Sequence, residues 1–193
     1  MSFTPLETAA VLFGIVSVYL SVRENIWSWP TAIVNVTLYV FVFHGARLYA
    51  DMALQFVYIA VSFYGWYSWL HGGRGRTGLP VSRATPRLWA ILAAIGVVSA
   101  AALGLMLSRW TDASLPYVDA STSTASLIAE WMMARKILEN WVVWVAVDVI
   151  YIGMFIYKSL YLTAFLYAVF LVLAAMGYVQ WKKSLAARET AAG

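Results

Sequence analysis

The chain has 193 residues, of which 63% are hydrophobic and 11% are charged, and its formal net charge is +4 at pH 7. A soluble domain of this length needs a larger share of charged residues on its surface, so the composition excludes a soluble globular protein and predicts an all-α polytopic membrane protein. The chain has no cysteine, which excludes disulfides, thiol catalysis and thiolate metal ligands.

Seven stretches have the apolar character of a membrane-spanning helix, which needs about 20 such residues. The first has no basic segment and no small-residue cleavage site before Arg23, so we interpret it as a retained helix rather than a signal peptide. The fifth is the least apolar, because it opens with STSTAS and contains Glu130. The predicted spans are Leu6–Val22, Trp27–Phe43, Ala50–Leu70, Leu88–Leu107, Ser121–Met133, Trp141–Tyr157 and Leu160–Trp181.

The basic residues between the spans predict the orientation, because cytoplasmic loops carry an excess of Lys and Arg. If the N-terminus lies outside, only Arg47, Arg109 and Lys158 face outward. The other ten basic residues then lie inside: Arg23, Arg74, Arg76, Arg83, Arg87, Arg135, Lys136, Lys182, Lys183 and Arg188. The sequence therefore predicts an outer N-terminus and a cytoplasmic C-terminus.

An internal repeat relates the beginning and the end of the chain. A gapless shift of 112 residues, which carries Arg23 onto Arg135, also matches rare tryptophans and a glycine. The repeat covers the first three and last three spans and leaves the fourth as a connector, so it predicts two parallel triple-helix bundles in a 3+1+3 arrangement, with a substrate site between them near the midplane. The further matches are Trp29 with Trp141, Tyr39 with Tyr151, Phe43 with Phe155, Leu48 and Tyr49 with Leu160 and Tyr161, Leu54 with Leu166, Val57 with Val169, Gly65 with Gly177, and Trp69 with Trp181.

This repeat divides the chain into four parts. We expect a first triple-helix bundle over residues 1–70, a basic inner loop and linker helix over 71–115, a second bundle over 116–181, and a cytoplasmic tail over 182–193.

The sixth span carries the main candidate site. Trp141, Trp144 and Asp148 are spaced i, i+3, i+7 and share one helix face, and Asn140 lies beside Trp144 at i+4. A carboxylate among indole rings attracts a flat organic cation, and acids inside membrane spans are usually functional. The alternative is a structural role, with the tryptophans in an interfacial belt and Asp148 bonded to a neighbouring helix. For Trp141 we favour the structural role.

Polar side chains on three other spans are candidates for the same cavity. Serine and threonine also bond their own helix backbone, asparagine and glutamine also join helices, and Glu130 could instead reach the inner interface. Gln55 offers both a donor and an acceptor, which suits a carboxamide or a ribose hydroxyl. The candidates are the stripe Thr122, Ser126 and Glu130, the stripe Thr31, Asn35 and Tyr39, and the single residue Gln55.

No cofactor or metal is expected. Both histidines, His44 and His71, fall in predicted loops, which excludes an H-E-x-x-H zinc site. The sequence also lacks the G-x-S-x-G pattern of a nucleophile elbow. An intramembrane enzyme using Asp148 and Glu130 as an acid pair is therefore a distant alternative.

Two long segments carry a resemblance to a known family. They are LYADMALQFVYIAVSFYGWYSWL (residues 48–70) and ARKILENWVVWVAVDVIYIGMFIYKSLYLTAFLYAVFLVLAAMGYVQW (residues 134–181). Together with WSWP (residues 27–30), they resemble the bacterial Pnu-type vitamin transporters, whose best-known members are the PnuC nicotinamide riboside carriers. The resemblance implies the 3+1+3 fold related to the SWEET sugar carriers, a homotrimer, and facilitated diffusion with the vitamin trapped by a cytoplasmic kinase.

The resemblance also implies site residues. The family's binding positions fall on Gln55, Asn140, Trp144 and Asp148, whereas Glu130 departs from the glutamine expected in many relatives. We therefore predict uptake of nicotinamide riboside, an NAD precursor, across the bacterial inner membrane. The nearer alternative is a thiamine carrier of the same family, because thiamine is also a flat permanent cation. Uncharged riboflavin would gain little from two acids. No nucleic acid is expected as a partner.

Overall fold

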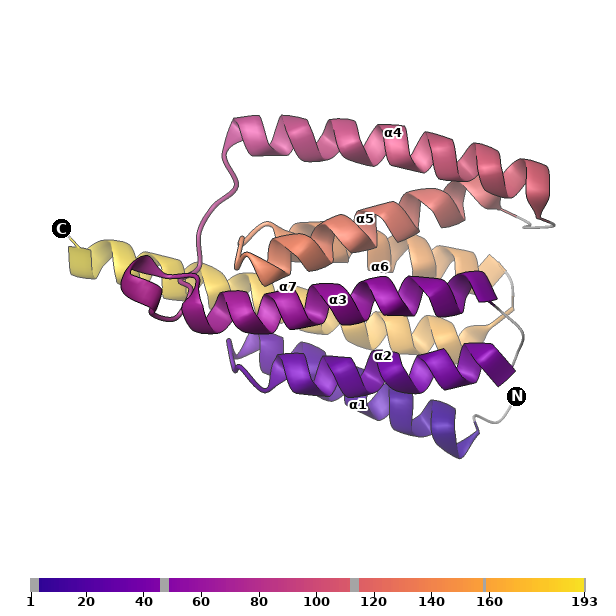
Figure 1. The fold of residues 1–193 in the computed structure, drawn as a ribbon, viewed down its shortest axis with the longest axis horizontal. Helices are drawn as coiled ribbons and strands as arrows, with labels where there is room; N and C mark the ends of the chain where they lie inside the picture. The colour runs from indigo at the N-terminus through magenta and orange to yellow at the C-terminus, as the bar shows by residue number, and fades with distance from the viewer. Residues whose placement is uncertain (1–3, 46–48, 112–114, 158, 193) are drawn as a thin grey trace.

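The computed structural model describes residues 4–45, 49–111, 115–157 and 159–192. These residues form seven α-helices and one 3₁₀ turn (Figure 1). The all-helical prediction and the number of helices are confirmed. The helices are α1 (Pro5–Val22), α2 (Ser28–Gly45), α3 (Tyr49–His71), α4 (Pro86–Trp110), α5 (Pro116–Ala134), α6 (Asn140–Tyr157) and α7 (Tyr161–Ala192), with η1 (Arg74–Arg76) after α3.

Four helices are long and apolar enough to cross a membrane by length and composition alone: α1, α4, α6 and α7. The other three carry more polar residues, and α5 in particular contains the Ser/Thr-rich stretch and Glu130. Such helices cross a membrane when their polar faces turn toward other helices.

The helix ends differ most from the predicted spans at the start of α5 and the end of α7. Pro116 opens α5 earlier than predicted, since proline suits the first turn of a helix. Helix α7 continues past Trp181 to Ala192, and Leu185 in this extension is buried against the core. His44 and His71, predicted in loops, lie in the last turns of α2 and α3.

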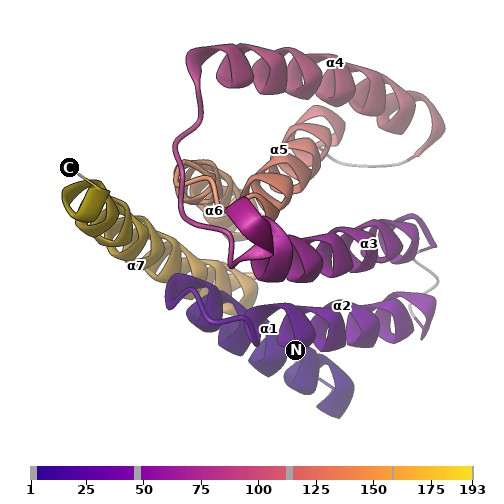
Figure 2. The ribbon, with the colours of Figure 1, turned by 60° about the vertical axis from the view of Figure 1, so that its left-hand side comes forward.

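The helices run roughly side by side, and α4 lies on the outside of the others (Figures 1 and 2). Consecutive helices pack together in the series α1, α2, α3 and again in the series α5, α6, α7. The two series meet where α1 packs on α7 and α3 packs on α5, and α4 packs against α5.

The residues matched by the shift of 112 make equivalent contacts. A Cβ added to Gly65 would lie 2.3 Å from the Trp29 ring, and one added to Gly177 would lie 2.5 Å from the Trp141 ring. Trp69 and Trp181 then meet these tryptophans edge-on, with ring centroids 5.4 Å and 5.3 Å apart. Glycine is needed at both positions because the indole occupies the space of a side chain.

Two indole hydrogen bonds join the two helix series. Trp69 Nε1 donates to the Met133 carbonyl at 3.0 Å, and Trp181 Nε1 donates to the Ser21 carbonyl at 2.9 Å. The shift of 112 carries Ser21 onto Met133, so the second bond is the counterpart of the first. All four tryptophans belong to one buried cluster at the end of the molecule where the α1–α2 and α5–α6 turns lie.

Candidate functional site

Asp148 lies in the middle of α6, and its side chain is only 3% exposed. No described residue forms a hydrogen bond or an ion pair with its carboxylate. An ionised carboxylate in an apolar interior is unfavourable unless it is paired. Asp148 is therefore a buried acid that is free to interact with a cation.

The first turns of α6 carry two further polar groups with unused capacity. Asn140 is fully buried, and its Nδ2 donates to the Ile137 carbonyl at 2.6 Å while its Oδ1 has no partner among the described residues. Trp144 packs beside the tryptophan cluster, and its buried Nε1 also has no partner there. Such groups are rare in folded proteins and call for a partner. The spacing i, i+4, i+8 places Asn140, Trp144 and Asp148 on one face, as predicted.

Trp141 differs from Trp144 in its packing, although the buried Nε1 of each has no partner among the described residues. Its side chain is 1% exposed, fills the space over Gly177 and meets Trp181 edge-on. These contacts support the structural role that the sequence favoured for Trp141.

The polar stripe of α5 faces α3 and α6. Thr122 is buried, and its hydroxyl donates to carbonyls of its own helix, at 2.9 Å to Val118 and at 3.1 Å to Asp119. Ser126 is also buried, but its hydroxyl forms no hydrogen bond with a described residue. Glu130 is half-buried and likewise has no hydrogen bond or ion pair there. Ser126 and Glu130 therefore add to the unused polar groups.

Several tyrosines that the sequence analysis did not select surround these groups. Tyr58 of α3 lies near Ser126 and Glu130, and Tyr151 of α6 lies near Ser126. Tyr167 of α7 contacts Tyr151, with ring centroids 4.7 Å apart, and lies within electrostatic range of Asp148. Two signals could have identified them: Tyr151 follows Asp148 at i+3, and the shift of 112 carries Gln55 onto Tyr167.

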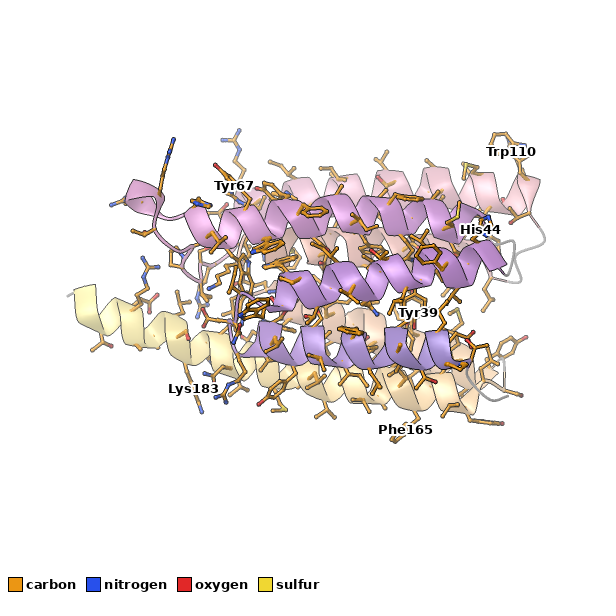
Figure 3. The ribbon with its side chains drawn as sticks, turned by 60° about the horizontal axis from the view of Figure 1, so that its bottom comes forward. Tyr39, His44, Tyr67, Trp110, Phe165 and Lys183 are labelled. Carbon is orange, nitrogen blue, oxygen red and sulfur yellow. The ribbon has the colours of Figure 1, made fainter. Side chains whose placement is uncertain are left out.

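The candidates on α2 and α3 have different surroundings. Asn35 is half-buried and donates from Nδ2 to the Ala10 carbonyl of α1 at 2.7 Å, which joins the two helices. Tyr39 stacks on Phe43 with ring centroids 5.6 Å apart, and lies in the half of the bundle where His44 lies (Figure 3). Thr31 donates to the Trp27 and Ser28 carbonyls, at 2.8 Å and 2.9 Å. Gln55 is half-buried with no hydrogen bond to a described residue.

Polar groups of four helices, α3, α5, α6 and α7, therefore lie near one another. Two cavities lie elsewhere. One of about 1060 Å³ lies under the 72–85 loop, and one of about 550 Å³ lies between α4 and α5. Neither is lined by Trp144 or Asp148.

Comparison with known proteins gives consistent results. The model of the nicotinamide mononucleotide transporter family matches residues 4–183. The nicotinamide riboside transporter PnuC of Escherichia coli is 26% identical, over 93% of this chain and 85% of that protein. The riboflavin/roseoflavin transporter RibM of Streptomyces davaonensis is 25% identical, over 88% of this chain and 81% of that protein.

A solved structure agrees with these relatives. The crystal structure of the vitamin B3 transporter PnuC matches the fold with a TM-score of 0.73 at 26% identity, over 92% of this chain and 80% of that one. With four helices apolar enough to span a bilayer, the molecule is a multi-pass membrane protein. The chain belongs to the nicotinamide mononucleotide transporter family.

Proposed function

We propose that this protein carries nicotinamide riboside across the bacterial inner membrane by facilitated diffusion. The observation that carries the proposal is Asp148, a buried carboxylate with no partner among the described residues, on the same helix face as the unpaired indole N–H of Trp144. Nicotinamide riboside is a flat cation with a permanent positive charge on its pyridinium ring. Charge and cation–π attraction favour such a ring beside a carboxylate and an indole.

Each polar group has a place in this proposal. Trp144 stacks on the pyridinium ring and Asp148 balances its charge. Gln55 and Asn140 supply donors and acceptors for the carboxamide and the ribose hydroxyls. The unused Ser126 hydroxyl and the nearby tyrosines complete the polar wall, and Glu130 adds a second negative charge.

The helix packing supports a 3+1+3 arrangement. In it, α1–α3 and α5–α7 are two bundles related by an axis along the membrane normal, and α4 links them. The paired contacts of Trp29 with Gly65 and Trp141 with Gly177 support this symmetry. The site would lie between the bundles, with the N-terminus outside and the residues after Trp181 in the cytoplasm.

The membrane potential can drive uptake of a cation. One positive charge gains about 2.3 kcal/mol per 100 mV of inside-negative potential, so no ion coupling is needed. The family resemblance adds two further elements to the proposal, a homotrimer and a cytoplasmic kinase that phosphorylates the riboside and prevents its return.

Two other vitamins are alternatives within the same family. Thiamine carries a permanent positive charge and would use Asp148 in the same way. Riboflavin is favoured by the likeness to RibM, which covers 88% of this chain. An uncharged riboflavin ring gains less from Asp148 and Glu130, so these two acids favour a cationic vitamin.

Binding of radiolabelled nicotinamide riboside to the purified protein tests the proposal, with thiamine and riboflavin as competitors. We expect Trp144→Ala and Asp148→Asn each to weaken binding at least tenfold, in line with about 2 kcal/mol for a desolvated contact. The matched controls are Trp27→Ala and Asp51→Asn, whose side chains are exposed, and we expect unchanged affinity. Unchanged affinity in both site variants would refute the proposed roles.

A further inference from the structure

A second polar feature lies away from Asp148, at the end of the bundle formed by the 72–85 loop. The cavity of about 1060 Å³ there lies between this loop, η1, α3, α5 and α7. Figure 1 shows that η1 and the last turns of α7 lie at this same end of the molecule. The cavity is therefore separate from the site proposed for the vitamin.

Four arginines with exposed side chains line this cavity, and each comes from a different segment. Arg74 belongs to η1, Arg83 to the loop, Arg135 to the end of α5 and Arg188 to the extension of α7. No aspartate or glutamate is among the lining residues. The lining also includes the hydroxyl groups of Tyr64, Ser82 and Thr85, which can donate to an anion. The hydroxyl of Thr77, also in the lining, donates to the Arg74 carbonyl at 3.0 Å.

The four arginines form no ion pair with the described residues. The ion pair that the described residues form, Lys136 with Glu24, uses none of the four arginines. Arg135 Nη1 donates at 3.2 Å to the hydroxyl of Tyr64, which is a neutral group. Glu139 Oε2 accepts the Ala84 amide at 2.8 Å, so one carboxylate lies near Arg83, although it does not line the cavity. Clustered like charges repel each other unless an anion lies between them.

The loop that carries Arg83 is fixed by its backbone. The Ser82 amide donates to the Lys136 carbonyl at 3.0 Å, and the Ser82 carbonyl accepts from the Leu138 amide at 2.9 Å. Leu79 donates to the Trp69 carbonyl at 3.0 Å, and Val81 is buried in the tryptophan cluster. The loop is thus held against α3 and the α5–α6 turn, so this wall of the cavity is built before a ligand arrives.

The extension of α7 provides the opposite side. Leu185 is buried against the core and fixes the helix beyond the predicted end of the span. Arg188 follows at i+3 and so lies on the same face as Leu185. The helical continuation therefore places a cation at the cavity, which a disordered tail would not do.

We propose that this cavity binds a phosphate group, carried by an anionic lipid headgroup or by a soluble phosphate compound. Arginine forms two parallel hydrogen bonds to phosphate oxygens, and four guanidinium groups suit a ligand with more than one anionic oxygen. The location at the helix ends suits a lipid headgroup, because basic pockets at that depth bind anionic lipids. The volume also admits a soluble phosphate compound larger than inorganic phosphate.

The test uses the full chain with two probes. The first is phosphatidylglycerol in nanodiscs whose remaining lipid is phosphatidylcholine, and the second is inorganic pyrophosphate added to phosphatidylcholine nanodiscs. Retention of phosphatidylglycerol is measured by native mass spectrometry, and pyrophosphate binding by isothermal titration. We expect one probe to bind, and which one binds identifies the source of the phosphate. Failure of both probes would overturn the proposal.

A matched pair of variants separates the cavity from general surface charge. Arg74→Gln/Arg188→Gln removes one charge from η1 and one from α7 within the cavity. Arg76→Gln/Lys183→Gln removes one charge from each of the same segments but outside its lining; Lys183 is seen at this end in Figure 3. We expect the cavity pair to weaken binding at least about tenfold and the control pair less than about twofold. Equal losses in the two pairs would show diffuse attraction and overturn the proposal.

A charge-preserving variant keeps the test decisive if the glutamine pair does not fold. Arg74→Lys/Arg188→Lys keeps both charges and removes the two-pronged contact with phosphate. We expect about a tenfold loss of binding, whereas unchanged binding would show that charge alone attracts the probe. Nicotinamide riboside binding in the same variants should stay unchanged, so failure of this proposal is distinct from failure of the proposed function.

Discussion

Helices α1–α3 and α5–α7 make equivalent contacts at the end of the bundle where the α1–α2 and α5–α6 turns lie. Their polar residues at the candidate site differ. The shared contacts are the tryptophan over a glycine, the edge-on tryptophan pair and the indole bond to the opposite series. Both turns also place a residue in the left-handed region at the same position, Glu24 at φ 53° and Lys136 at φ 50°. The repeated residues therefore build the scaffold.

Most polar residues of the candidate site do not repeat, the exception being Tyr39 with Tyr151. Asp148 and Trp144 have apolar counterparts, and the glutamine of α3 corresponds to a tyrosine in α7. An asymmetric ligand at a symmetric interface needs different groups on its two sides, so a substrate site is expected where the repeat is broken. The pairs related by the shift of 112 are Asp148 with Val36, Trp144 with Ala32, Asn140 with Ser28, Tyr167 with Gln55, and Val147 with Asn35.

The largest expected effect is on the shared scaffold. Trp29→Ala and Trp141→Ala should each lower the free energy of unfolding by about 3–5 kcal/mol, because each removes a buried indole and leaves a cavity over a glycine. Thermal denaturation in detergent measures this, with Trp110→Ala as the control because Trp110 is 78% exposed. A large effect at one position and none at the other would contradict the equivalence of the two halves.

The next effect concerns a position where the halves differ. Asp148→Val gives α6 the residue that α2 has at Val36. We expect nicotinamide riboside binding to fall about thirtyfold or more, because the cation loses a desolvated partner worth about 2–5 kcal/mol. Thermal stability should be equal or higher, since the variant removes an unpaired buried carboxylate. Loss of stability together with binding would instead indicate that Asp148 is part of the scaffold.

Opposite charges occupy one pair of equivalent positions. Glu24 and Lys136 are related by the shift of 112, their side chains are mostly buried, and they are joined at 3.0 Å. Lys136 Nζ also lies 4.5 Å from the centroid of the Trp69 ring. Identical charged residues at positions 24 and 136 would repel each other. The difference between the two halves at this pair therefore stabilises the fold.

A charge exchange tests this pair. Glu24→Lys alone should lower the free energy of unfolding by about 1–3 kcal/mol, since two partly buried lysines then face each other. Glu24→Lys/Lys136→Glu should recover most of the loss, because a lysine at position 24 would meet Trp181, the counterpart of Trp69. Thermal denaturation of both single variants and the double variant gives the coupling. If the double variant lost as much stability as the two single variants together, the two charges would not be interchangeable.

The sequence predicted the scaffold better than the site. Hydropathy located all seven helices, and the repeat identified Gly65 and Gly177, whose contacts the structure then explained. Helical periodicity shows which residues share a face but not which neighbour that face meets. Thus it could not show that Asn35 bonds α1, or that Tyr151 contacts Tyr167 close to Asp148.

The smallest expected effects distinguish two neighbouring hydroxyls of α5, neither of which repeats in α1, where Ala10 and Gly14 take their places. Thr122 donates within its own helix, so Thr122→Val should change nicotinamide riboside affinity less than about twofold. Ser126 is buried with an unused hydroxyl near Tyr58 and Tyr151. Ser126→Ala should therefore weaken binding about three- to tenfold, the value of one hydrogen bond, without loss of thermal stability.

Each of these variants is the control for the other, because they remove one hydroxyl each, one helical turn apart on the same helix. Equilibrium binding and thermal denaturation of both variants decide the matter. If Thr122→Val weakened binding and Ser126→Ala did not, the ligand would lie one helical turn nearer the N-terminal end of α5, on the same face. The ligand would then contact Thr122, whose hydroxyl already donates within α5, and not Ser126, whose hydroxyl has no partner among the described residues. A buried polar group without a partner would therefore not indicate the binding site in this protein.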